Sequence, residues 1–265
     1  MTSPYVVSLL SQNATDVSLF GAKAANLAKA VQLGFAVPSG LAVSRLCQKN
    51  EFALIAKEII DELTPPIAVR SSAAEEDSET KSFAGRFETR LGIRTTADLL
   101  ESFVAVKSSG STNLVKKYNG ETIPPEHIAV LIQRMVDATR AGIAFSRDPS
   151  TGEQKVIIES NYGLGKSVVD GEVTPDSIEY RNDGTYKTFI GRKSVQITLD
   201  DTGIRTENTP ATDSQRSSLT HNEIIEIAEL TQRVERDLGF AADIEWAFDT
   251  EGMLWLLQAR PITTL

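Results

Sequence analysis

The hydrophobic and polar residues follow two periodic patterns along the chain. One pattern predicts helices and the other predicts strands. Apolar residues spaced three and four apart predict helices over residues 24–31, 51–63, 95–109, 111–118 and 220–238. Short runs rich in branched and aromatic residues predict strands at 5–10, 34–43, 67–72, 87–93, 128–136, 141–147, 156–159, 177–181, 185–190 and 195–199. Residues 200–218 are polar and acidic, and we expect a loop there.

The last predicted helix has the clearest signals at its ends. Thr220 and Glu223 have the spacing of a capping box, and Gly239 stands where a helix ends in a left-handed residue. Between them runs one apolar stripe, which is typical of a helix packed on a core: Ile224, Ile227, Ala228, Thr231, Val234 and Leu238. We assign this stripe to packing and give it no chemistry.

The C-terminal stretch, residues 243–263, predicts a β-hairpin. Apolar-rich runs at 243–248 and 254–262 flank four turn-like residues at 249–252. If the loop has two residues, Glu251 and Gly252, then Glu245 lies opposite Gln258 and Asp243 opposite Arg260. Because strand side chains alternate between faces, these four side chains share one face, and the other face carries a second set: Ile244, Trp246, Leu257 and Ala259.

The polar face of this hairpin combines two carboxylates, an amide oxygen and a guanidinium. Oxygens from Asp243, Glu245 and Gln258 suit a divalent cation such as Mg²⁺, and Arg260 beside them suits a phosphate. A surface ladder of salt bridges is the alternative reading, and it stays open on this stretch alone. Both readings depend on the assumed register.

Two further segments have the chemistry of a phosphate site. A helix is predicted just after Gly21, with Lys23 in its first turn, and a helix N-terminus favours anions. The predicted strand 67–72 ends in Arg70 and two serines, and small residues follow it up to Gly85, where backbone N–H groups could approach phosphate oxygens. A solvated lysine and an ordinary hairpin loop with an exposed arginine are the alternatives.

Composition narrows the class of protein. At 265 residues the chain can form one domain or two intimate lobes, and its net charge of −9 argues against nucleic acid as the main partner. No apolar run reaches the ~18–20 residues of a membrane span, and the N-terminus lacks the pattern of a signal peptide. The single cysteine, Cys47, excludes an internal disulfide. We therefore expect a cytoplasmic protein with no membrane partner.

A resemblance to a nucleotide-binding loop is dismissed. Residues 163–167, GLGKS, look like the end of a Walker A loop, but the first glycine of that motif would fall on Ser160. Gly171 and Pro175 follow closely and oppose the long helix that the motif requires.

The order of the motifs carries a more specific resemblance. The chain reads GAKAANL, IAVRSSAAEED, SFAG, IQRMV, AFSRDPSTGE, GLGKSVVDGEVTPD, DIEWAF and LQARPIT in succession. This succession resembles the ATP-binding domain of phosphoenolpyruvate synthase, pyruvate phosphate dikinase and rifampin phosphotransferase, and the resemblance spans about residues 19–263. It implies an ATP-grasp fold in which two α+β lobes grip ATP and Mg²⁺. We place the N-terminal lobe at 1–126 and the C-terminal lobe at 127–265.

The resemblance also implies roles for individual residues of the N-terminal lobe. Lys23 is similar to a lysine of the family's GGKG segment, and Arg70 is similar to the arginine of its RSS motif, both on the phosphates. Gly85 and Thr89 match the mobile phosphate loop, and Gln133 matches the position beside the adenine-binding connection.

In the hairpin, Glu245 and Gln258 look like the family's pair that binds magnesium and nucleotide. Asp243 looks like a supporting carboxylate, and Arg260 like the arginine on the transferring phosphates. Relatives usually carry a glycine where Ala22 and Ala24 stand, and a glutamate where Lys166 stands.

The full-length enzymes pass phosphate through a histidine on a separate swivelling domain. His127 and His221 do not lie in such a loop, and we expect both at the surface. The acceptor would then be a histidine of a separate protein or a small molecule. A carboxylate–amine ligase of the ATP-grasp type and a non-catalytic nucleotide-binding module are the alternatives.

Overall fold

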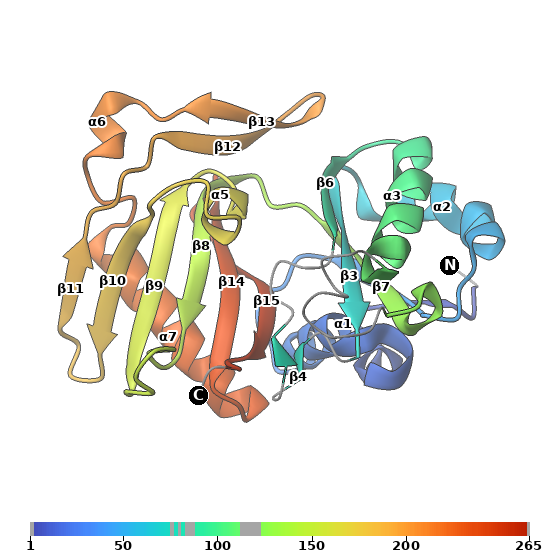
Figure 1. The fold of residues 1–265 in the computed structure, drawn as a ribbon, viewed down its shortest axis with the longest axis horizontal. Helices are drawn as coiled ribbons and strands as arrows, with labels where there is room; N and C mark the ends of the chain where they lie inside the picture. The colour runs from blue at the N-terminus through green and yellow to red at the C-terminus, as the bar shows by residue number, and fades with distance from the viewer. Residues whose placement is uncertain (1–2, 75–76, 79–80, 83–87, 112–122, 264–265) are drawn as a thin grey trace. The chain divides into compact units, whose positions relative to one another are not determined.

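The computed structural model describes residues 3–74, 77–78, 81–82, 88–111 and 123–263. The chain divides into two compact units, shown as ribbons in Figure 1. Unit 1 comprises Met1–Gly34, Pro38–Met135 and Asp201–Gly203, and unit 2 comprises Phe35–Val37, Val136–Asp200 and Ile204–Leu265. Each unit combines a β-sheet with helices, which confirms the α+β class.

Unit 1 is built on a five-stranded antiparallel sheet in the order β1-β2-β7-β3-β6. Its strands are β1 (Val6–Ser8), β2 (Gly40–Val43), β3 (Ile67–Ala73), β6 (Thr89–Ile93) and β7 (Ile128–Arg134). The unit also contains a separate strand pair, β4 (Asp77–Ser78) and β5 (Lys81–Ser82). Its helical segments are η1 (Gln12–Thr15), α1 (Val17–Gln32), α2 (Lys49–Leu63), α3 (Thr96–Ser108), η2 (Ser109–Ser111) and η3 (Pro125–His127).

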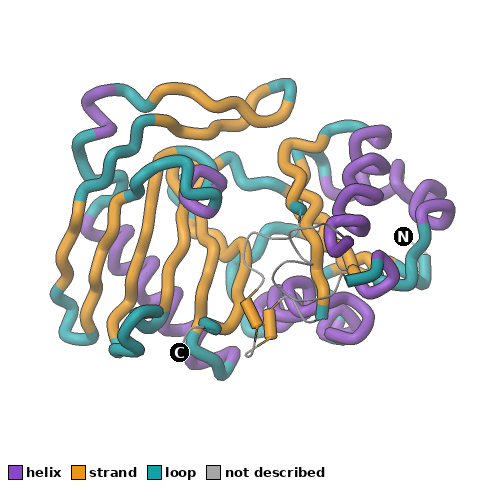
Figure 2. Tube along the Cα trace, viewed as in Figure 1, coloured by secondary structure: helices purple, strands orange, loops and turns teal. Residues whose placement is uncertain are grey.

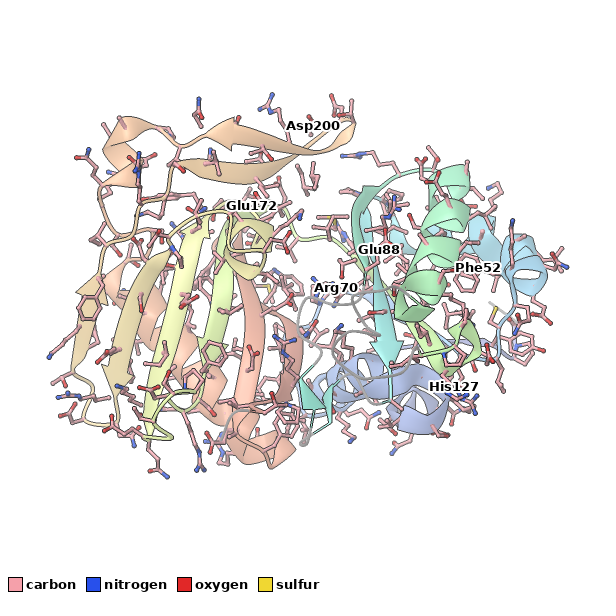
Figure 3. The ribbon with its side chains drawn as sticks, in the orientation of Figure 1. Phe52, Arg70, Glu88, His127, Glu172 and Asp200 are labelled. Carbon is pink, nitrogen blue, oxygen red and sulfur yellow. The ribbon has the colours of Figure 1, made fainter. Side chains whose placement is uncertain are left out.

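The two faces of this sheet are covered by different helices. Val69 and Ile132 belong to a buried cluster with α2 and α3, where the Phe52 and Phe103 rings stack with centroids 3.9 Å apart. The other face packs against α1, because the Ala24 amide donates to the Ser72 hydroxyl at 3.1 Å. Strand alternation places Arg70 on the same face as Ser72, and Figure 3 shows Arg70 and Phe52 on different sides of β3.

Unit 2 is built on a six-stranded antiparallel sheet in the order β11-β10-β9-β8-β14-β15. Its strands are β8 (Ala138–Phe145), β9 (Lys155–Tyr162), β10 (Asp176–Arg181), β11 (Tyr186–Phe189), β14 (Ala242–Asp249) and β15 (Leu254–Pro261). Helix α7 (His221–Leu238) crosses one face of this sheet, behind the strands in Figure 1. The short helix α5 (Lys166–Val169) contacts β8 and β9.

The signals at the ends of α7 are confirmed. The Thr220 hydroxyl accepts from the Glu223 amide, the Glu223 carboxylate accepts from the Thr220 amide at 2.7 Å, and Gly239 adopts a left-handed φ of 82°. The apolar stripe is buried from Ile224 to Val234, while Leu238 is half-buried. The helix therefore packs as its sequence predicts.

The polar stretch after residue 200 is not the expected loop. β12 (Val195–Asp200) and β13 (Gly203–Asn208) form a two-stranded ribbon, followed by the short helix α6 (Ala211–Ser214), as Figure 2 shows in orange and purple. Most side chains of β13 are at least partly exposed, so the strand has no need of alternating apolar residues. Its pairing with β12 could not be inferred from hydrophobicity.

The boundary between the units lies further along the chain than residues 126 and 127. Strand β7 pairs with β2 and β3, so it belongs to the sheet of unit 1, and the chain passes into unit 2 after Met135. The expected helix at 111–118 lies, beyond its first residue, outside the described residues. No helix in the described ranges is both long and apolar enough to cross a membrane.

Candidate functional site

The hairpin of β14 and β15 has the expected register where the polar residues lie. Asp243 pairs with Arg260, Ile244 with Ala259, and Glu245 with Gln258. Directly paired residues of antiparallel strands point to the same side of a sheet. The structure therefore confirms that Asp243, Glu245, Gln258 and Arg260 share one face.

The expected two-residue loop, however, is wrong. The Asp249 amide donates to the Met253 carbonyl at 3.1 Å, so three residues lie between the strands instead of two. The Asp249 carboxylate explains the longer turn, because it accepts hydrogen bonds from the amides of Glu251 and Met253 and from the Trp255 indole.

A β-bulge compensates for the extra turn residue. Trp246 pairs with Leu256 and Glu245 with Gln258, which leaves Leu257 as an additional residue on β15. Leu256, and not Leu257 as expected, lies opposite Trp246 on the core face and is fully buried. Leu257 is only half-buried.

The four polar residues sit in a partly desolvated environment. Asp243 is only 8% exposed, and its Oδ2 atom accepts from the Arg260 Nε atom at 2.8 Å. Burial raises the pKa of Asp243 to about 6, and the Arg260 guanidinium opposes that rise. Gln258 is 3% exposed, and Glu245 is half-buried. Asp243 thus fixes the guanidinium of Arg260 beside the Glu245 and Gln258 pair.

A fifth polar residue lies on the same face and was missed in the sequence. Glu245 pairs with Ile143 of β8, and Ile143 pairs with Glu159 of β9, so Glu159 points to the side that carries Glu245. The sequence predicts a strand at 156–159, but the face of a strand depends on its neighbours in the sheet. Only the strand order places this carboxylate.

In unit 1, three of the expected residues share a face of the sheet. Arg70 on β3 pairs with Thr89 on β6 and with Leu131 on β7, and Gln133 follows Leu131 on the same side of β7. Arg70 is half-buried and Thr89 is exposed. The Gln133 Nε2 atom donates to the Pro38 carbonyl at 3.5 Å. This is the face covered by α1.

Lys23 lies where α1 changes direction. Gly21 interrupts the helix with φ 74° and ψ 170°, so a regular helical turn begins at Ala22, as expected. A Cβ atom on Gly21 would lie 1.8 Å from the Ser72 carbonyl oxygen. Because only glycine tolerates both constraints, α1 comes close to β3, and Lys23 follows in the first turn with 8% of its surface exposed.

The remaining expectations concern four other residues. Gly85 lies outside the described residues. His127 and His221 are both exposed, as expected, and the His221 Nδ1 atom lies 2.9 Å from the Tyr186 hydroxyl. Lys166 forms ion pairs with Asp170 and Glu172, so its charge is locally compensated.

The donor set of the hairpin face fits a magnesium ion that takes two oxygens from the protein and the rest from phosphates and water. Glu245 and Gln258 supply two hard oxygens side by side, which is the preference of this cation. Across the described ranges, no three His, Cys, Asp or Glu side chains form a group that could bind a metal ion on its own. Magnesium commonly takes one or two protein oxygens and completes its shell with phosphates and water.

Comparisons with known proteins identify the family of the chain. The family described as "Pyruvate phosphate dikinase, AMP/ATP-binding domain" matches residues 45–265. An uncharacterized phosphotransferase, YvkC, of Bacillus subtilis is 33% identical, over 97% of this chain and 35% of that protein. A probable phosphoenolpyruvate synthase of Methanothermobacter thermautotrophicus is 30% identical, over 98% of this chain and 46% of that protein. The chain thus spans less than half the length of these curated relatives.

More distant similarity extends to solved structures. The biotin carboxylase of Campylobacter jejuni, crystallised as a β-γ-ATP complex, aligns with 89% of this chain and 39% of its own, at 14% identity and a TM-score of 0.44. The family match covers most of the chain, including β3, β7 and the whole hairpin of β14 and β15. On this match the chain belongs to the pyruvate phosphate dikinase AMP/ATP-binding domain family.

Proposed function

We propose that this chain is the ATP-binding, ATP-grasp part of a phosphotransferase that uses Mg²⁺-ATP. The observation that carries the proposal is the pairing of Glu245 with Gln258, beside an Arg260 that Asp243 holds in place. This set supplies oxygens for a hard cation and a planar cation for a phosphate on one face of a rigid sheet.

In this proposal the hairpin positions the reacting end of the nucleotide. Magnesium, when bound, would neutralise the charge that spreads over the β- and γ-phosphates. Glu245 and Gln258 would hold it through their side-chain oxygens, with Asp243 as the supporting carboxylate. Arg260 would contact the transferring phosphate, and its ion pair with Asp243 fixes the direction of the guanidinium before the nucleotide arrives.

The residues of unit 1 would bind the rest of the nucleotide. Lys23 and Arg70 supply positive charge for the phosphates, and Gly85 and Thr89 would contact the phosphates beside them. Gln133 would lie beside the adenine. The α1 face of the unit 1 sheet supports this grouping, since Arg70, Thr89 and Gln133 share it.

The proposed reaction also needs a molecule that accepts the phosphoryl group. Relatives are named phosphoenolpyruvate synthase and rifampicin phosphotransferase, so the family phosphorylates chemically different acceptors. We propose that a histidine of a swivelling domain or a small molecule receives the phosphoryl group, and that the chain works in the cytoplasm, where ATP is available.

The first experiment measures the binding of the nucleotide by thermal unfolding. A ligand that binds only the folded state adds about 2.7 kcal/mol of stability at 100-fold saturation, so Mg²⁺-ATP should raise the melting temperature by several degrees. A melting curve that does not move in millimolar Mg²⁺-ATP contradicts the proposal.

The second experiment tests the assigned cations. Arg260→Ala and Lys23→Ala should each reduce nucleotide turnover by about 100-fold or more while the protein stays folded, because each loses a preorganised contact to phosphate. Arg205→Ala on β13 is the matched control, since it removes the same charge from an exposed ion pair with Glu207. Identifying AMP or ADP as the product, with each class of acceptor, separates a dikinase from a ligase.

A further inference from the structure

Glu159 lies in line with the proposed metal-binding pair. One row of directly paired residues crosses four strands, from Glu159 on β9 through Ile143 on β8 to Glu245 on β14 and Gln258 on β15. All four side chains therefore point to the face of the sheet opposite α7. The carboxylate of Glu159 faces the same space as the Glu245 and Gln258 oxygens.

The surroundings of this carboxylate are unusual for an acidic side chain. Glu159 is half-buried, and burial alone raises its pKa. No hydrogen bond or ion pair joins its side chain to any residue in the described part of the chain. Glu179, on the same face one strand further out, instead lies 3.7 Å from the Lys155 ammonium. A half-buried carboxylate is costly unless a cation lies near it, so a bound metal ion would stabilise Glu159.

The charge of Glu159 also reaches the hairpin. Glu159 lies in the same paired row as Glu245, and Asp243 lies two residues along β14 from Glu245, on the same side of the sheet. Three carboxylates thus contribute negative charge on the face that also carries the Arg260 guanidinium. An anionic nucleotide without a metal would be repelled there, whereas a divalent cation would be attracted.

The spacing of the strands limits how Glu159 can act. Neighbouring strands lie about 4.8 Å apart, so the backbones of Glu159 and Glu245 are about 10 Å apart across β8. The carboxylates do not form a cluster that could enclose a metal directly. Magnesium keeps several of its waters in protein sites, and a hydration water can span such a gap.

We propose that Glu159 is a positioning residue for the magnesium of this site and acts by accepting hydrogen bonds from the metal's hydration water. The proposal rests on the function proposed above, because it requires the metal at Glu245 and Gln258. It adds a residue from a different strand, β9, to the metal environment.

The test measures ATP affinity by calorimetry with and without Mg²⁺, using Glu159→Gln. Without metal, the variant should bind ATP about threefold to tenfold more tightly, because one repelling charge is gone. With saturating Mg²⁺, it should bind about tenfold more weakly, because losing an outer-sphere partner typically weakens a metal site by that order. The substitution is thus expected to strengthen ATP binding without Mg²⁺ and to weaken it with Mg²⁺.

Two further variants separate this role from a structural one. Glu159→Asp keeps the charge but shortens the side chain, so it should match the wild type without metal and weaken binding only with Mg²⁺. Glu179→Gln removes a carboxylate from the same face, one strand away, and should change neither affinity. A Glu159→Gln effect of the same sign and size in both conditions overturns the proposal, and so does an unfolded Glu159→Gln protein, since the carboxylate would then be needed by the fold itself.

Glu245→Gln distinguishes failure of this inference from failure of the proposed function. If Glu245→Gln loses the magnesium dependence and Glu159→Gln leaves both affinities unchanged, the function stands and the role of Glu159 is refuted. If neither variant alters the magnesium dependence, the metal site on the hairpin is itself refuted.

Discussion

Glu245 lies directly opposite Gln258 although the turn between their strands is one residue longer than the tightest hairpin turn. The three-residue turn closed by Asp249 would shift the partners by one position, and the bulge at Leu257 restores them. The site face therefore depends on two irregularities that cancel. Neither is visible as an apolar or polar pattern.

The register makes a prediction about two adjacent residues. Glu245→Gln should weaken magnesium affinity by at least about tenfold, because it removes a charged oxygen from the proposed metal site. Ile244→Gln, on the opposite face and fully buried, should leave that affinity nearly intact and lower the free energy of unfolding by about 3 kcal/mol. Calorimetry and urea unfolding measure the two effects. The opposite assignment of effects would show that the faces are exchanged.

The close approach of α1 to β3 predicts the effect of a single methyl group. Gly21→Ala should lower the free energy of unfolding by more than about 3 kcal/mol, because the new Cβ would meet the Ser72 carbonyl and the backbone conformation excludes side chains. Gly171→Ala is the control. Gly171 also has a positive φ, but a Cβ there meets nothing within 4 Å, so the cost should stay near 1 kcal/mol. Equal losses of stability in urea unfolding would refute the role of the contact.

A buried ion pair joins the start of β10 to the segment just before β12. The Lys193 Nζ atom lies 2.6 Å from Asp176 Oδ1, and both side chains are fully buried. Lys193→Met should lower the free energy of unfolding by about 3–5 kcal/mol, because it leaves the carboxylate of Asp176 buried without its cation. Lys187→Met, on the exposed side of β11, should cost less than about 0.5 kcal/mol. Chemical denaturation of both variants provides the comparison.

Asp148 predicts a feature of the acid unfolding curve. The hydrogen bond from Lys155, followed by the amide of Ser150, lowers the pKa of Asp148 from 3.8 to about 2. The ionised group therefore stabilises the folded protein above about pH 4, and this stability is lost as the pH falls towards 2. At pH 3, unfolding should take up about 0.8 proton at this residue. Asp148→Asn should remove that uptake and flatten the dependence of stability on pH between 4 and 2, as measured by denaturation across this range.

Local signals in the sequence are sufficient for the ends of α7 and for the start of the regular turn at Ala22. A capping box, a terminal glycine and an apolar stripe each act within a few residues, so Thr220, Glu223 and Gly239 could be predicted from the sequence. The register at Glu245 was also correct, but the loop assumed for it was not. Counting outward from a two-residue loop predicts this pairing only because the bulge at Leu257 offsets the longer turn.

Non-local features could not be predicted in this way. Glu159 joins the site face through Ile143, and this neighbour relation exists only once the order of the strands is known. Strand β7 reads as the beginning of the strand-rich half, yet it pairs with β2 and β3 of the first sheet. The exposed strand β13 gains its stability from pairing with β12, and its own composition resembles a loop.

The bulge at Leu257 separates the length of the turn from the geometry of the metal face. A homologous chain with a two-residue turn and no residue equivalent to Leu257 would present the same four side chains. In an alignment, such a chain would show two single-residue gaps, one in the turn and one five to seven positions later. Either gap alone also leaves Gln258 opposite Glu245, because shortening the turn or removing the bulge residue changes none of the pairs around it.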